Sequence, residues 1–191
     1  MKSPELKVLP FKTAEAFGVW LQKHHSTSPG IWIQFYKKGS GTQTITYAKA
    51  LDEALCYGWI DSQAKSFDDK SYLQRFGPRK PKSMWSKRNR THIERLTKEG
   101  RMKPAGLSQV ASAKADGRWD GAYDSPKNME VPDDLLKALA KHKKAEQFFK
   151  SLNKANVYAI AWRLQTAKKP ETRQKRMDLI LAMLKKGQTF N

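Results

Sequence analysis

Seven Lys or Arg residues and no acidic residue occupy residues 75–90, RFGPRKPKSMWSKRNR, together with two prolines and one tryptophan. Cations spaced this closely favour binding of an anion, because one phosphate or carboxylate can then meet several positive charges. The prolines fix backbone φ angles, so we expect an extended, stiffened arm. The predicted anion-binding residues of this arm are Arg75, Arg79, Lys80, Lys82, Trp85, Lys87, Arg88 and Asn89.

A helix is expected to begin at the end of the arm, capped by Ser86. The first turn of a helix has unpaired N–H groups and a partial positive charge, which favour an anion. Lys87 and Arg88 oppose that charge, an arrangement that a bound anion would stabilise. Trp85 could stack on a base or a sugar. The alternative is that Trp85 fills the core and the cations are only solvated, and the sequence leaves both interpretations open.

A second group of polar residues follows CYGWIDSQAK, residues 56–65. Asp61 and Gln63 alternate along an expected strand and therefore project to the same face. Asp61 could pair with an arginine of the arm or act as an acid–base group. Arg101 follows Gly100, an expected left-handed helix cap, and could bond helix carbonyls or reach an anion. The competing hypothesis is an enzyme or small-anion receptor with a pocket between the sheet and the arm. Its lining would be Asp61, Gln63 and Arg101, with Arg75, Arg79, Trp85 and Asn89.

No catalytic residue, metal site or cofactor is predicted. The four histidines are scattered, and one cysteine cannot form a cluster of metal ligands. The glycine-rich phosphate-binding motifs and the GxSxG nucleophile motif are missing from the sequence. Cys56 is interpreted as a small buried residue. We therefore favour a protein that is not an enzyme.

The expected fold class is α+β, in which a small N-terminal sheet has helices on one face and an all-helical basic part follows. Thr13 and Thr46 can each cap a helix. Residues 31–36 are β-branched and aromatic, and residues 59–66 and 71–76 read as a hairpin. The predicted domains are residues 1–125, the α+β core with the arm and two helices, and residues 126–191, a helical subdomain packed on it.

Net charge and cysteine content indicate the cellular compartment and the type of partner. The chain has 191 residues and a net charge of +19, and residues 135–191 contribute fourteen Lys or Arg against three acids. A single cysteine suits a reducing compartment. We find no signal sequence and no run of eighteen apolar residues that could span a membrane. The expected location is the cytoplasm, with nucleic acid as the first candidate partner and no particular oligomeric state indicated.

Five stretches together resemble the YdeI/OmpD-associated (OmdA) family of bacterial proteins, labelled bacteriocin-protection. They are EALCYGWIDSQ, RFGPRKPKSMWSKRN, EGRMKPAGL, AKADGRWDGAYDSP and RLQTAKKPETR, and the resemblance spans roughly residues 10–190. It implies a cytoplasmic bacterial protein connected with tolerance of bacteriocins or cationic peptides, and it supplies no catalytic residues. Gly77 stands where relatives are expected to have a small polar residue such as threonine.

A chain of net charge +19 repels cationic peptides, so any protection would have to be indirect. The leading hypothesis is therefore a non-enzymatic basic protein that binds an anionic ligand, with nucleic acid first, in bacterial stress or bacteriocin protection. A scaffold without a ligand is a third possibility, for which Arg79→Ala and Lys82→Ala would be silent.

Overall fold

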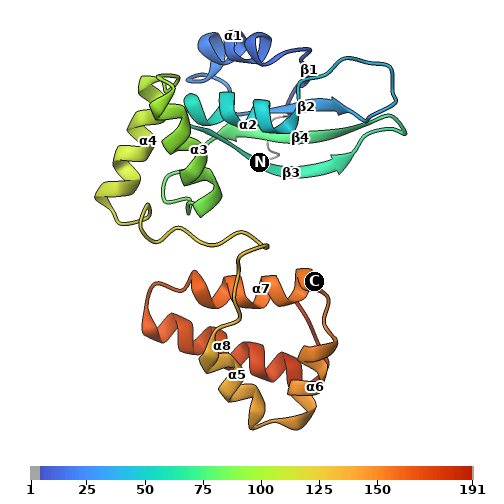
Figure 1. The fold of residues 1–191 in the computed structure, drawn as a ribbon, viewed down its shortest axis with the longest axis vertical. Coiled ribbons are helices and arrows are strands. Elements are labelled where there is room, and N and C mark those ends of the chain that lie inside the picture. Colours follow the sequence, from blue (N-terminus) through green and yellow to red (C-terminus); the bar gives the residue numbers. More distant parts are fainter. Residues whose placement is uncertain (1–4, 191) are drawn as a thin grey trace. The chain divides into compact units, whose positions relative to one another are not determined.

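The computed structural model describes residues 5–190, which form two compact units (Figure 1). The first unit contains residues 5–83 and 89–120, and the second contains residues 84–88 and 121–190. The first unit holds a four-stranded sheet, and the second carries the four C-terminal helices. The predicted α+β class is therefore confirmed. The predicted packing of residues 126–191 on the preceding part stays a prediction.

The sheet of the first unit has the strand order β1-β2-β4-β3. Its strands are β1 (Val8–Pro10), β2 (Ile31–Tyr36), β3 (Trp59–Ser66) and β4 (Ser71–Pro78). β3 and β4 form the predicted antiparallel hairpin, β4 also pairs with β2, and β1 runs parallel to β2. The three-residue β1 was not predicted, because a segment this short that ends in proline has no strand pattern of its own.

Two helices cover one face of this sheet, as Figure 1 shows. They are α1 (Ala14–His24) and α2 (Tyr47–Cys56), and the side chains of Thr13 and Thr46 cap them as predicted. Burial alternates along β2, so that Ile31, Ile33 and Phe35 are buried while the residues between them are only half-buried. The buried set packs beneath the helices with Phe17 and Phe76, and the opposite face of the sheet carries the other set.

Two further helices, α3 (Lys87–Lys98) and α4 (Pro104–Ala115), follow the arm. Each ends at a glycine with positive φ, Gly100 at 67° and Gly117 at 72°, which confirms the predicted left-handed caps. After Gly117 the chain folds back, and the N–H of Trp119 bonds the carbonyl of Ala113 at 3.0 Å. The indole of Trp119 is consequently buried.

The second unit is built from α5 (Asp133–Ala140), α6 (Lys143–Ser151), α7 (Lys154–Gln165) and α8 (Pro170–Lys185). Their apolar stripes meet in one core of buried residues: Leu135, Leu139, Ala145, Phe149, Ile160, Leu164, Met177, Ile180 and Leu184. Burial of these side chains leaves the lysines and arginines of the same helices on the exterior. Among residues 5–190, none of the helices has the length and apolar character needed to cross a bilayer.

Candidate anion-binding surface

The arm of residues 75–90 is divided between the two units, and two of its predicted ligands are buried. Arg79 is 5% exposed and Trp85 is 2% exposed. The carbonyl of Trp85 accepts the N–H of Tyr123 at 3.0 Å, which fixes this part of the chain within the second unit. A buried indole presents no free ring face to a base, which supports the alternative interpretation that Trp85 fills the core. Burial of so large an apolar ring stabilises the fold, because it removes the apolar surface of the ring from water.

The protein supplies its own anions near the end of the arm. Lys87, the first residue of α3, pairs with Asp124 at 2.9 Å, and this hydrogen bond lowers the pKa of the Asp124 carboxyl. Arg118 is buried, pairs with Asp116 at 2.7 Å, and donates to the carbonyl of Ser83 at 3.0 Å. The sequence did not indicate either carboxylate as a partner of these cations. Asp124 lies 37 residues after Lys87, and Asp116 lies beside Arg118 and outside the arm.

Several predicted arm residues do remain accessible. Lys80 and Lys82 are exposed, Arg88 is exposed, and Arg75 and Asn89 are half-buried. Lys80 and Lys82 sit in a tight turn in which the N–H of Ser83 bonds the carbonyl of Lys80 at 3.1 Å. The arm thus offers individual cations, and their role in anion binding stays a prediction.

The residues of the predicted pocket have other contacts. Tyr47 donates a hydrogen bond to Asp61 at 2.7 Å, and the carbonyl of Gln63 accepts one from the side chain of Gln74 at 3.1 Å. Arg101 pairs with Glu53 at 2.7 Å and with Glu99 at 3.2 Å. The two carboxylates neutralise Arg101, which makes it a structural link from the end of α3 to α2.

A surface that the sequence reading missed lies on the sheet face opposite the helices. Trp32 and Tyr36 project from β2 on this face, and Arg75 stands directly beside Trp32 on β4. Lys65 on β3 places its ammonium 4.5 Å from the centroid of the Trp32 ring. We call these four residues the sheet-face cluster. The available signal was the alternation in IWIQFY, in which every second residue is too polar or too large for a small core.

The sheet-face cluster has an aromatic and cationic character. Within the described chain, Lys65 and Arg75 have no carboxylate within ion-pair distance. Two acids, Asp68 and Asp69, lie in the β3–β4 turn at the hairpin end of the sheet, and a hydrogen bond from Ser71 lowers the pKa of the Asp68 carboxyl. A ligand with planar rings and negative charges therefore fits this face better than a cation does.

Cys56 at the end of α2 is buried at 2% exposure, and burial raises the pKa of its thiol to about 11. A thiol that stays protonated and covered is a poor nucleophile. We expect iodoacetamide to modify Cys56 in the folded protein at pH 8 roughly 100-fold more slowly than in denaturant, as mass spectrometry would measure. Equal rates would show that the thiol is open to solvent and contradict its structural interpretation.

The raised pKa of the Cys56 thiol also makes the stability of the folded protein depend on pH. In the unfolded chain the Cys56 thiol loses its proton near its ordinary pKa of 9.0, whereas in the folded chain burial raises this pKa to about 11. Between these values the unfolded state binds fewer protons, so stability falls as the pH rises through this range.

Among residues 5–190, His, Cys, Asp and Glu side chains form no group of three or more suited to holding a metal ion.

Comparison with protein families divides the chain near the boundary between its two units. Residues 9–109, more than half of the chain, match the family model of a domain of unknown function (DUF8412). The chain belongs to the DUF8412 family. The DUF8412 match covers β1 from Leu9 onward, the other three strands, α1 to α3 and the first half of α4, and so includes the sheet-face cluster.

Residues 128–187 match a second family model, described as "Bacteriocin-protection, YdeI or OmpD-Associated" (OmdA). This match confirms the OmdA resemblance that the sequence predicted. It is confined to the helical second unit, a narrower span than the predicted residues 10–190. Comparisons with curated proteins and with solved structures gave no significant match.

Proposed function

We propose that this protein is a non-enzymatic, cytoplasmic nucleic-acid-binding protein, and that the sheet-face cluster receives a single strand. The observation that carries the proposal is the placement of Trp32 and Tyr36 on one strand, with Arg75 beside Trp32 on β4 and the Lys65 ammonium reaching the Trp32 ring from β3. Aromatic rings on a sheet stack with bases, and the flanking cations contact the phosphates of the same strand.

The spacing of the two rings suits bases of one strand. Trp32 and Tyr36 are four residues apart on β2, which separates them by about 13 Å along the strand. That distance allows each ring to stack on a different base, and a stacked base contributes about 1–3 kcal/mol. The Lys65 ammonium, which lies over the Trp32 ring in the free protein, would move to a phosphate as the base takes its place.

The charge of the whole chain supports a polymer of negative charge as the ligand. The net charge is +19, and Lys80 and Lys82 follow β4 in an exposed turn. A duplex hides the faces of its bases, so half-buried aromatic rings favour an unpaired strand. We place the bacteriocin-protection label of the OmdA family in the same setting, with protection acting indirectly through nucleic acid because like charges repel cationic peptides.

The proposal predicts specific losses of affinity in fluorescence anisotropy with a labelled oligouridine. Trp32→Ala and Tyr36→Ala should each weaken binding by about 10- to 100-fold, because each variant removes one stacking platform. Arg75→Ala and Lys65→Ala should weaken it less and reduce the slope of log K against log salt by about one. Wild-type binding should fall steeply as salt rises from low to physiological concentration.

Lys23→Ala is the matched control, since Lys23 is an exposed cation in the last turn of α1, on the helix-covered side of the sheet. It should bind as the wild type does. Binding that is insensitive to salt would count against the proposal. So would wild-type affinity in a folded Trp32→Ala, Tyr36→Ala double variant, because the sheet-face cluster would then not be the binding surface.

A further inference from the structure

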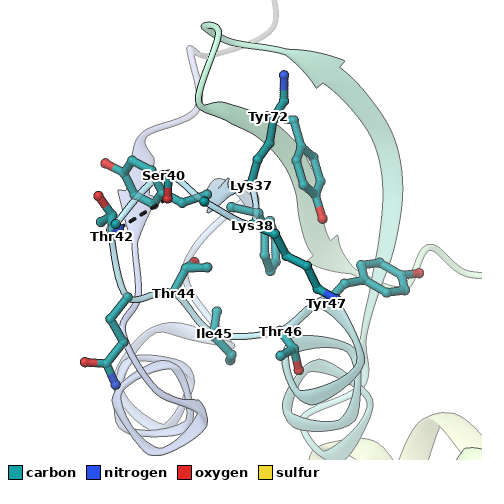
Figure 2. Close-up of a pocket in the computed structure, with 14 residues that line it drawn as sticks. Lys37, Lys38, Ser40, Thr42, Thr44, Ile45, Thr46, Tyr47 and Tyr72 are labelled. Carbon is teal, nitrogen blue, oxygen red and sulfur yellow. Dashed lines mark hydrogen bonds between the residues drawn. The ribbon is translucent and has the colours of Figure 1, made fainter.

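A pocket of about 570 Å³ lies beneath the loop that joins β2 to α2 (Figure 2). The loop has two glycines with positive φ, Gly39 at 85° and Gly41 at 75°, which allow it to arch away from the sheet. The N–H of Ile45 bonds the carbonyl of Phe11 at 2.9 Å and fixes the far end of the arch. A volume of this size is typical of sites for small molecules.

Aromatic and apolar side chains form the floor of this pocket. Phe35 and Ile45 are each 2% exposed, and Tyr72 stacks on Phe35 with ring centroids 5.3 Å apart and an interplanar angle of 16°. Partial burial also raises the pKa of the Tyr72 phenol. A flat ring placed against Tyr72 would extend this stack.

Among the described residues that line the pocket, two are formally charged, and both are lysines. Lys37 bonds the carbonyl of Asp69 at 3.1 Å and points away toward the β3–β4 turn, whereas Lys38 extends across the pocket toward Tyr47 (Figure 2). In the described chain Lys38 has no ion pair, and no acidic residue lines the pocket. An ammonium in such surroundings favours an anion.

A buried hydroxyl gives an independent indication of a ligand. The Oγ1 atom of Thr44 is buried and, among the described residues, has no hydrogen-bond partner. Thr44 lines the pocket, and its side chain lies inside the arch of the loop (Figure 2). Buried polar atoms are nearly always hydrogen-bonded, so an exception beside a cavity points to a group that occupies the cavity.

We propose that this pocket binds a small planar anion, an aromatic ring that carries one phosphate or carboxylate group. The ring stacks on Tyr72, the anionic group pairs with the ammonium of Lys38, and Thr44 hydrogen-bonds the ligand. This site differs from the pocket predicted from the sequence, which was placed between the sheet and the arm. Its floor is distinct from the sheet-face cluster, because Tyr72 and Phe35 lie on the helix-covered face, although Tyr36 of that cluster also lines the pocket edge.

Isothermal titration calorimetry with two probes tests the proposal and distinguishes the source of the anion. Adenosine 5′-monophosphate represents an aromatic phosphate, and 4-hydroxybenzoate represents an aromatic carboxylate. At least one should bind about tenfold or more tightly than its neutral counterpart, adenosine or 4-hydroxybenzyl alcohol, because the ion pair with Lys38 needs the charge. Lys38→Ala should remove this preference, and Thr44→Val should weaken binding several-fold at unchanged shape.

Lys23→Ala again serves as the control and should bind the probe as the wild type does. Failure of both anions to bind would overturn the proposal, and so would equal affinity for the neutral counterparts or an unchanged Kd in Lys38→Ala. The outcome is independent of the nucleic-acid test, since Lys38→Ala should leave oligouridine affinity unchanged and Trp32→Ala should leave the small anion bound.

Discussion

Replacing Gly106 by alanine is expected to destabilise the first unit by about 3 kcal/mol, the largest effect of any single methyl group that we anticipate. A Cβ at this position would lie 2.3 Å from the carbonyl oxygen of Cys56 and 2.8 Å from that of Leu55. Both atoms are backbone at the end of α2, so no side-chain rotation can relieve the clash. The same Cys56 oxygen accepts the N–H of Lys103 at 3.1 Å, and moving α4 away would break that bond too.

Thermal unfolding followed by circular dichroism, with hydrogen exchange of α2 and α4, measures this effect. Gly18→Ala in α1 is the matched control, because its Cβ would meet no backbone atom and only Oε2 of Glu53, at 2.9 Å, while Oε1 of that carboxylate pairs with Arg101. Alanine is the better helix former by up to about 1 kcal/mol, so this control should be neutral or slightly stabilising. If Gly106→Ala proved as stable as Gly18→Ala, the close approach of α4 to α2 would be incorrect.

The elements of this fold were predictable wherever a local signal defined them. Thr13 and Thr46 cap their helices, residues 31–36 form a strand, and Gly100 and Gly117 end theirs, because each of these depends on neighbours within a few positions. β1 was missed because its partner strand, and not its own three residues, determines its structure.

The candidate site was harder to predict, since it depends on contacts between distant residues. Trp85 had the sequence context of an exposed stacking ring, and only the fold shows that it is buried. Trp32 lies in an apolar run that reads as core, and the sheet register is needed to see that it shares an open face with Arg75. The density of positive charge in the sequence thus indicated an anionic ligand in general. The alternation along β2 was the feature that indicated which face of the sheet carries Trp32.

Asp52 is a second position at which one substitution should have a large effect, and Asp52→Ala is expected to lower the free energy of unfolding by about 2 kcal/mol. Its side chain is 13% exposed on α2 and accepts hydrogen bonds from two residues of α3, His92 at 2.7 Å and Arg95 at 2.6 Å. Alanine would leave the largely buried His92 ring without this partner. Arg95 is 43% exposed, so water screens its share, and the loss should stay below that of a fully buried pair.

Urea unfolding of the full chain measures the change in stability, with Asp69→Ala as a control that removes an exposed carboxylate from the β3–β4 turn. The control should lie within about 0.5 kcal/mol of the wild type. A double-mutant cycle separates the pair from general damage, because His92→Ala should cost much less once Asp52 is already alanine. Additive losses would mean that Asp52 and His92 do not interact. If they do interact, α3 is fastened to α2 by a hydrogen-bonded polar pair as well as by apolar packing, which explains how a helix as polar as KRNRTHIERLTK keeps a defined place with only Ile93 and Leu96 buried.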